Sequence, residues 1–191
     1  MTATDDILDF WFGEPWSPER GAYRKAWFVK DTAFDDTIRA RFLDDYEHAA
    51  TGGYDAWAKT PDGSLALLIL LDQFPRNLFR GEARTYATDG KAHAVAEAAL
   101  ARGFDEGPSP CECWFLYLPF EHSEHLEDQY RAVTLFDSLP DDEPNRKAKE
   151  SARRHLEIIR RFGRFPHRNE ILGRPSTAAE IEFLKEANSR F

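Results

Sequence analysis

The strongest candidate for proton-transfer chemistry is a histidine that stands among carboxylates. Residues 120–125 read Phe-Glu-His-Ser-Glu-His, with His122 directly before a helix predicted to start at Ser123. Histidine changes charge near neutral pH, so His122 could act as a general acid or base, tuned by Glu124 or Asp72. A histidine that only hydrogen-bonds to neighbouring backbone or carboxylate groups is the structural alternative.

The same cluster contains groups that could bind a metal ion or attack a substrate. His122 and His125 are three residues apart and would share a helix face, as a pair of metal ligands can. The chain lacks both H-E-x-x-H and E-x-x-H, so this spacing does not identify a metal site, and we expect no metal or cofactor. Ser123 adjoins His122, but adjacent side chains rarely meet in the geometry of a nucleophile and its base.

Asp72 and Gln73 close the most apolar segment of the chain. Residues 64–73 read Ser-Leu-Ala-Leu-Leu-Ile-Leu-Leu-Asp-Gln, and this Leu-rich composition favours a buried helix. A carboxylate in the last turn of a helix opposes the helix dipole, and such violations mark functional or compensated positions. We therefore expect Asp72 either to pair with Arg76, four residues on, or to face a ligand together with Gln73.

A second set of candidates follows the basic helix predicted at residues 145–162. Arg164, His167 and Arg168 lie on a short turn stiffened by Pro166. Guanidinium groups held in this way suit two-point recognition of a carboxylate or phosphate, or they clamp the acidic side chains of the other clusters. Both roles are compatible, because acids that orient the arginines would help them to bind an anion.

Charge is distributed unevenly along the chain. The 25 basic and 34 acidic residues give a net charge of −9, but residues 146–174 carry ten bases and only three acids. This basic segment either packs against the acidic remainder or forms a local anion site. An acidic protein is a poor binder of the phosphate backbone, so we expect no nucleic-acid partner.

Helical periodicity runs through nearly the whole chain. Residues 32–51 are the clearest case, with apolar residues at every fourth position and a capping box at Thr32. The other predicted helices cover residues 5–12, 17–29, 64–73, 85–102, 109–118, 123–138, 145–162 and 177–188. Strand-like alternation bounded by turn signals is absent. The sequence therefore predicts an all-α fold of antiparallel neighbouring helices, with residues 1–191 forming a single domain.

Two further features concern location. The longest unbroken apolar run covers residues 65–71, far short of the roughly 20 residues that a membrane-spanning helix needs, so we expect no membrane partner. The cysteines, Cys111 and Cys113, are spaced so that they do not readily pair, and the N-terminus lacks a leader pattern. These features predict a cytoplasmic protein with reduced thiols.

Five blocks of sequence carry a resemblance to a known family. They are Phe10-Trp11-Phe12-Gly13; Trp27-Phe28 with Phe34-Asp35 and Ile38; Leu71 to Asn77; Leu116 to Pro119 with His122-Ser123-Glu124 and Gln129; and Arg161 to Asn169 with Leu172-Gly173-Arg174 and Ser176-Thr177. In this order they resemble the bacterial family catalogued as domain of unknown function 924. The resemblance implies a tetratricopeptide-like, right-handed array of paired antiparallel helices, and it implies no established activity.

These observations give one leading hypothesis and two alternatives. We expect a pocket that binds a small anionic ligand or an acidic peptide end, lined by Asp72, Gln73, Arg76, His122, Glu124, Arg164, His167 and Arg168. In the first alternative this pocket belongs to a metal-independent hydrolase or transferase for a phosphorylated or carboxylated substrate, with His122 as general acid/base. In the second, the helices form a scaffold for a protein partner. Convergence of the candidate residues in one concave pocket would favour a ligand site over a scaffold.

Overall fold

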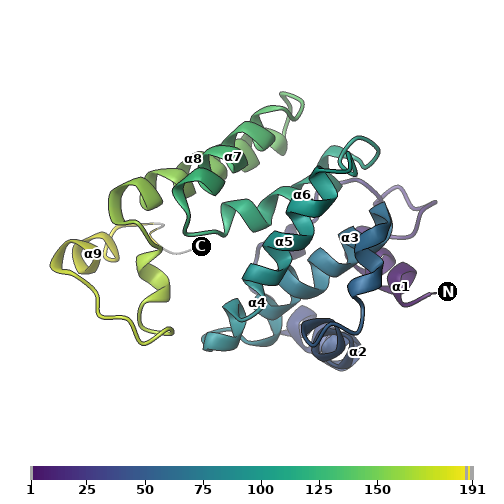
Figure 1. The fold of residues 1–191 in the computed structure, drawn as a ribbon, viewed down its shortest axis with the longest axis horizontal. Coiled ribbons are helices and arrows are strands. Elements are labelled where there is room, and N and C mark those ends of the chain that lie inside the picture. Colours follow the sequence, from purple (N-terminus) through teal and green to yellow (C-terminus); the bar gives the residue numbers. More distant parts are fainter. Residues whose placement is uncertain (1, 188, 190–191) are drawn as a thin grey trace.

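Helices form the regular structure of residues 2–187 and 189, the part of the chain that the computed structural model describes (Figure 1). The α-helices are α1 (Ala3–Phe12), α2 (Thr32–Ala50), α3 (Pro61–Leu68), α4 (Phe74–Leu78), α5 (Asp89–Leu100), α6 (Pro110–Glu121), α7 (Leu126–Asp137), α8 (Asn145–Phe162) and α9 (Ala178–Phe183). Short 3-10 turns lie at Lys25–Trp27, Asp55–Lys59, Ala83–Tyr86 and Pro166–Arg168. The predicted all-α fold is confirmed, and the bounds of α8 are those predicted.

The main hydrophobic core surrounds α3. This helix contacts α1, α5 and α6, and every residue from Leu65 to Leu71 is buried. A helix that is apolar on all sides has no face to offer to water, so its neighbours must enclose it. Trp11 and Phe12 are fully buried in this core, where both rings pack edge-on against Phe115. These two aromatic residues are therefore core residues and not walls of a pocket.

The helix that starts at Pro61 does not end at Gln73. α3 runs into a π-helical turn, η3 (Ile69–Gln73), and the chain continues directly into α4. Asp72 therefore lies inside a continuous helical segment, so its predicted place in a last turn is wrong. Pro75 occupies the first turn of α4, where a missing N–H is tolerated. π-Helical turns inside helices are frequent at functional sites.

Two helix ends near His122 also differ from the prediction. α6 passes through Pro119 and ends at Glu121, so Pro119 removes one backbone donor without stopping the helix. α7 begins at Leu126 and not at Ser123. The Ser123 hydroxyl donates to the Asp128 carboxylate at 2.6 Å, so it is engaged by a side chain of the first turn.

At two other helix starts one predicted cap forms as expected, and the other lies one residue earlier than predicted. The predicted capping box of Thr177 with Glu180 is confirmed. At α2 the N-cap is Asp31, whose carboxylate accepts from the backbone N–H groups of the first turn, and Thr32 is already helical. Residues 17–29 contain only the 3-10 turn at Lys25–Trp27, so the predicted helix there is wrong.

α8 connects the main core to the C-terminal segment. It packs along α7, which in turn packs on α6 (Figure 1). Its apolar face places Ala152 in the main core, whereas Ile158 and Ile159 join Phe165 and Phe183 in a second, smaller cluster. This arrangement holds the turn at Pro166–Arg168 within reach of the α3–α4 segment and leaves a cleft between them.

Candidate ligand-binding cleft

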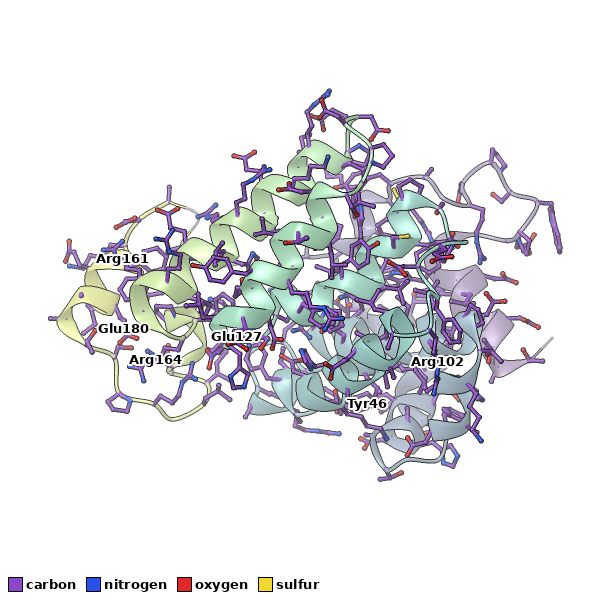
Figure 2. The ribbon with its side chains drawn as sticks, turned by 45° about the horizontal axis from the view of Figure 1, so that its top comes forward. Tyr46, Arg102, Glu127, Arg161, Arg164 and Glu180 are labelled. Atoms are coloured by element: carbon purple, nitrogen blue, oxygen red, sulfur yellow. The ribbon has the colours of Figure 1, made fainter. Side chains whose placement is uncertain are left out.

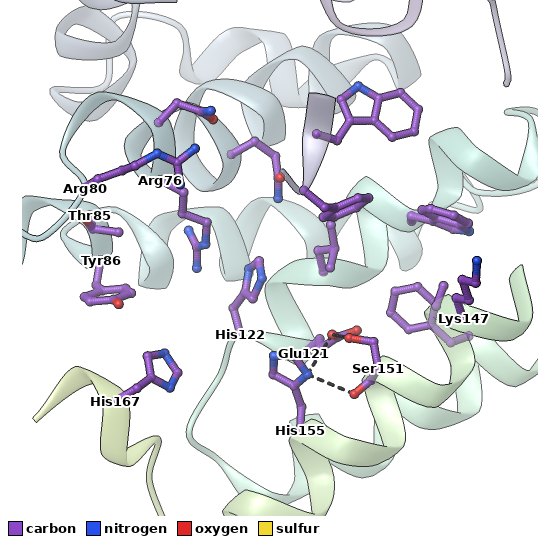
Figure 3. Close-up of a pocket in the computed structure, with 18 of the residues that line it drawn as sticks. Arg76, Arg80, Thr85, Tyr86, Glu121, His122, Lys147, Ser151, His155 and His167 are labelled. Atoms are coloured by element: carbon purple, nitrogen blue, oxygen red, sulfur yellow. Dashed lines mark hydrogen bonds and ion pairs between the residues drawn. The ribbon is translucent and has the colours of Figure 1, made fainter. Parts of the chain in front are cut away.

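A cleft of about 910 Å³ lies between the α3–α4 segment, the end of α6, α8 and the turn at Pro166–Arg168 (Figure 3). Its polar lining residues include Gln73, Arg76, Asn77, Arg80, Tyr86, Glu121, His122, Lys147, Ser151, His155, His167 and Arg168. Its apolar lining residues include Tyr23, Trp27, Phe28, Trp114, Leu118 and Phe136. A cavity of this size is in the range that accepts medium-sized organic molecules.

Four aromatic side chains form one wall of the cleft. The Trp114 ring lies 6.1 Å from the ring of Tyr23 and 6.2 Å from that of Phe28, and Trp27 contacts both Tyr23 and Phe28. Tyr23 and Phe28 are about half exposed, so they stand where the cleft meets solvent. The indole N–H of Trp114 donates to Asn145 at 2.8 Å, which ties this wall to the start of α8. Flat rings that face a cavity offer a large apolar surface to a ligand.

Asp72 and His122 form a carboxylate–imidazole pair. Nδ1 of His122 lies 2.7 Å from Oδ1 of Asp72, and the side-chain amide of Gln73 donates to the other carboxylate oxygen. The Asp72 side chain is 1% exposed, whereas the His122 ring lines the cleft. An ionised carboxylate only accepts, so Nδ1 carries the proton. Nε2 has no hydrogen-bond partner among the described residues and is the acceptor of the neutral ring.

Nearby charges keep Asp72 ionised and His122 neutral. Burial alone would raise the pKa of Asp72, but the positive charges of Arg76 and protonated His122 lower it to about 2. Burial, followed by the charge of Arg76, lowers the pKa of His122, and this outweighs the opposite effect of Asp72. The imidazole is therefore uncharged at pH 7 and able to accept a proton.

Arg76 and Arg168 share one carboxylate, that of Asp89 at the start of α5. Arg76 donates to both oxygens of Asp89, at 3.0 and 3.1 Å, and its Nη1 lies 3.4 Å from Oδ1 of Asp72. Nη1 of Arg168 is 3.6 Å from Oδ2 of Asp89. Two guanidinium groups thus face two carboxylates, and the other lining cations, Arg80 and Lys147, pair with Asp35 and Glu143, so the cleft carries no large positive excess.

Arg168 is held in the cleft wall by stacking and not by hydrogen bonds. Its guanidinium carbon lies 4.6 Å from the ring centre of Tyr86 and 4.5 Å from that of Phe165, and the side chain is 8% exposed. None of its guanidinium N–H groups makes a hydrogen bond with a described residue, and Nε is shielded from solvent. Buried donors in proteins are almost always paired, so this group is suited to an acceptor that enters the cleft.

The structure adds a second carboxylate–imidazole pair that sequence reasoning missed. Nδ1 of His155 lies 2.9 Å from Oε1 of Glu121, and the Ser151 hydroxyl donates to the same oxygen at 2.8 Å. Both members of the pair are buried, and the two histidine rings, His122 and His155, are 6.4 Å apart. His155 stands on the apolar face of α8, and a histidine among apolar residues is the signal that could have identified it.

Three of the predicted site residues do not line the cleft: Asp72, which lies behind His122, and Glu124 and Arg164, which lie elsewhere. Glu124 accepts two hydrogen bonds from Arg174, at 2.7 and 3.0 Å, and one from the backbone N–H of Phe165. Arg164 binds Glu180 through two hydrogen bonds at 2.6 and 2.8 Å, beside α9 (Figure 2). Both side chains fasten the C-terminal segment. The cleft instead brings together Gln73, Arg76, His122, His167 and Arg168, with Asp72 directly behind His122.

Ion pairs account for most of the basic segment. The pairs are Arg146 with Asp141 and Glu143, Arg153 with Asp137, Arg161 with Glu186, Arg164 with Glu180, Arg168 with Asp89, and Arg174 with Glu124. Packing of basic side chains against acidic ones thus explains the charge pattern along α8, and of the basic side chains of this segment Lys147 and Arg168 line the cleft.

Other kinds of site find no support in the described part of the chain. Residues 2–187 and 189 contain no group of three or more His, Cys, Asp or Glu side chains placed to hold a metal ion. Both cysteines are buried free thiols, and burial raises the pKa of each to about 11. Within the same residues, no helix combines the length and the apolar character that crossing a bilayer demands.

Comparisons with known proteins give a family and a related structure. The sequence model of a family described as bacterial protein of unknown function (DUF924) matches residues 7–188. The solved structure of the protein of unknown function ATU0120 from Agrobacterium tumefaciens is 42% identical in sequence, with a TM-score of 0.86. That match covers 96% of this chain and 97% of the other. No curated protein matches significantly.

Proposed function

Because this chain belongs to the DUF924 family, whose function is unknown, we propose a function from its own cleft: it binds a medium-sized organic carboxylate. The observation that carries this proposal is Arg168. A guanidinium that is almost buried, that stacks between two rings and whose ion pair with Asp89, at 3.6 Å, is longer than a hydrogen bond can still donate to an acceptor in the cleft. A carboxylate matches the two-point geometry of a guanidinium.

Charge balance supports a carboxylate over a phosphate. Arg76 and Arg168 are offset by Asp72 and Asp89, so the cleft can accept one further negative charge more readily than two. A phosphate dianion would also be repelled by the carboxylates of Asp72 and Asp89, which lie next to the two arginines. The same balance disfavours a free inorganic phosphate as the natural ligand.

The aromatic wall supports a ligand with an apolar body. An isolated carboxylate group would fill a small part of a cleft of about 910 Å³. Tyr23, Trp27, Phe28 and Trp114 offer ring faces to the rest of the molecule. Burial of a ring or alkyl chain there would contribute about 25 cal/mol per Å² of apolar surface removed from water.

The test is a thermal-shift and calorimetric comparison of benzoate, phenylacetate, hexanoate, phenyl phosphate and inorganic phosphate. We expect the carboxylates with an apolar body to stabilise the protein. A ligand at 100 times its Kd adds about 2.7 kcal/mol, or about 5–10 °C for a domain of this size. Arg168→Gln should abolish the shift, whereas Arg160→Gln, an exposed arginine on α8, should leave it unchanged.

Each alternative has its own result in this experiment. A shift with the two phosphates and none with the carboxylates would replace the proposed ligand class. A shift that survives Arg168→Gln would place the ligand elsewhere. Absence of any shift across the series would contradict the ligand site and favour the scaffold for a protein partner.

A further inference from the structure

The Asp72–His122 pair has the arrangement of a general base that faces a ligand cleft. We propose that this protein hydrolyses carboxylic esters, with His122 removing a proton from the attacking water. The inference rests on the proposed function, because the acid released by hydrolysis is the kind of carboxylate that the cleft is proposed to bind. Ester hydrolysis adds to ligand binding a reaction at the same site and a general base, His122, which binding alone would not require.

The geometry gives His122 the correct nitrogen for this role. Nδ1 is fixed to Asp72 at 2.7 Å, so the neutral ring keeps its lone pair on Nε2. Nε2 has no hydrogen-bond partner among the described residues, and the ring lines the cleft (Figure 3). Asp72 orients the ring and stabilises the imidazolium that forms when His122 accepts a proton, which makes Asp72 a positioning residue.

Water is the nucleophile because the serine hydroxyls near His122 are engaged elsewhere and the cysteine thiols are buried away from the cleft. The Ser151 hydroxyl lines the cleft but donates to Glu121 at 2.8 Å, and the Ser123 hydroxyl donates to Asp128 at 2.6 Å. Cys111 and Cys113 are buried, with raised pKa values, and neither lines the cleft. No serine or cysteine of the described residues is therefore activated by His122.

The reaction balances with water as the sole co-reactant. Nε2 of His122 takes a proton from water while the water oxygen forms a bond to the ester carbonyl carbon. The carbonyl oxygen becomes an oxyanion that the guanidinium groups of Arg76 and Arg168 stabilise. The carbon–oxygen bond to the leaving alcohol then breaks, and the alkoxide receives the proton from His122. The products are one carboxylic acid, which ionises, and one alcohol.

The charge of the site favours an ester over a phosphate ester. An ester is neutral, and only one negative charge develops as it reacts, which the balanced set of Arg76, Arg168, Asp72 and Asp89 can accept. Phosphoryl transfer places charge on several oxygens at once and normally requires more cationic groups or metal ions. The arginines here are already shared with Asp89.

The test measures hydrolysis of 4-nitrophenyl phenylacetate by the full-length protein through release of 4-nitrophenolate. We expect multiple turnovers, with kcat reduced by about 10²–10⁴-fold in His122→Gln and KM little changed. His125→Gln, which alters an exposed histidine three residues away, should retain the wild-type rate. Imidazole added to His122→Ala should restore part of the rate, which a structural role of His122 would not allow.

The pH dependence of the rate in Asp72→Asn tests the positioning role, because replacing a purely structural residue would not shift it. The rate should rise with pH as His122 loses its proton, and loss of the Asp72 charge should move this limb to lower pH. The charged and titratable groups around the ring are Asp72 and Arg76 from the α3–α4 segment, Glu121 from α6, Asp89 from α5 and His155 from α8. An unchanged pH profile in Asp72→Asn would contradict the role of this pair.

The two proposals fail in different ways. Phenylacetate binding without turnover of the ester would overturn the hydrolase and leave the binding function intact. Turnover that depends on His122, without detectable phenylacetate binding, would support the base and contradict the proposed ligand. Turnover that persists in His122→Gln, or a single acylation event without turnover, would also overturn the inference.

Discussion

Replacement of Asp72 by Asn isolates the electrostatic contribution of a buried carboxylate. The two side chains have nearly the same shape, so the change removes the negative charge and leaves the packing in place. The charges of Arg76 and His122 lower the pKa of Asp72 from 3.8 to about 2, after burial has opposed them. That difference corresponds to roughly 2 kcal/mol of unfolding free energy when His122 is protonated, and to less at neutral pH, where the ring is uncharged. We therefore expect Asp72→Asn to lower the unfolding free energy by an amount of this order, with a further loss because the amide NH2 of Asn donates where the carboxylate accepted from Gln73 or His122.

The stability lost in Asp72→Asn should depend on pH, in a direction that follows from the lowered pKa of Asp72. The folded-state pKa of Asp72 lies below its unfolded value, so the stabilisation is fully present above about pH 4 and disappears as pH falls toward 2. Urea unfolding of the wild-type protein and Asp72→Asn should give a difference at pH 5 at least as large as at pH 7, because protonation of His122 strengthens its pair with Asp72. The difference should shrink at each lower pH at which the proteins remain folded.

A matched control is available on the surface. Asp6 pairs with Arg41 at 2.7 Å, and both side chains are about half exposed. Asp6→Asn should change the unfolding free energy by less than about 1 kcal/mol, because exposed ion pairs contribute little. Equal losses in the two variants, or an Asp72→Asn protein as stable as the wild type, would refute the assignment of a strongly stabilised charge to Asp72.

Three further predictions concern other parts of the chain. Gly163 ends α8 at φ 69° with open space around it, so backbone strain alone should make Gly163→Ala less stable by about 1–2 kcal/mol in urea unfolding. Gly163→Asn should lose less, and equal stability of all three proteins would contradict this explanation. Glu124→Gln should leave Arg174 without its ionic partner and lower the unfolding free energy by about 1–3 kcal/mol, while phenylacetate binding is retained. Loss of binding without loss of stability would instead indicate that Glu124 contacts the ligand. Cys111 and Cys113 should resist iodoacetamide in the native protein at pH 8, as their pKa values of about 11 imply, and mass spectrometry should detect labelling only after denaturation.

Local sequence patterns predicted most of the helices because the relevant forces act within a few residues. The basic helix predicted at residues 145–162 has those bounds in the structure, and the capping box at Thr177 formed as predicted. Predictions that relied on a single residue to end a helix were less accurate. Pro119 did not end α6, and Gln73 did not end the helix that contains Asp72. In both places burial of the surrounding apolar residues outweighed the local preference.

The sequence predicted the kinds of side chain that form the candidate site, but only some of the individual residues that it selected lie there. Asp72 and His122 were selected because their charges conflict with their local surroundings, and they lie in contact across 50 residues of sequence. Glu124 was selected as a carboxylate beside His122 and Arg164 as a guanidinium on a Pro-stiffened turn, but both fasten the C-terminal segment, through Arg174 and Glu180 respectively. Sequence spacing cannot distinguish these outcomes, because either set of partners satisfies the same charges.

The sequence by itself determined an all-α fold, a buried Leu-rich central helix and a short set of histidines, arginines and acids with unusual surroundings. Only the tertiary structure decided which of these groups share a cleft, which nitrogen of His122 is available and that the Arg168 guanidinium makes no hydrogen bond with a described residue. The reason is physical. Helix formation depends on neighbours three or four positions away, whereas a site depends on side chains that packing brings together from distant helices.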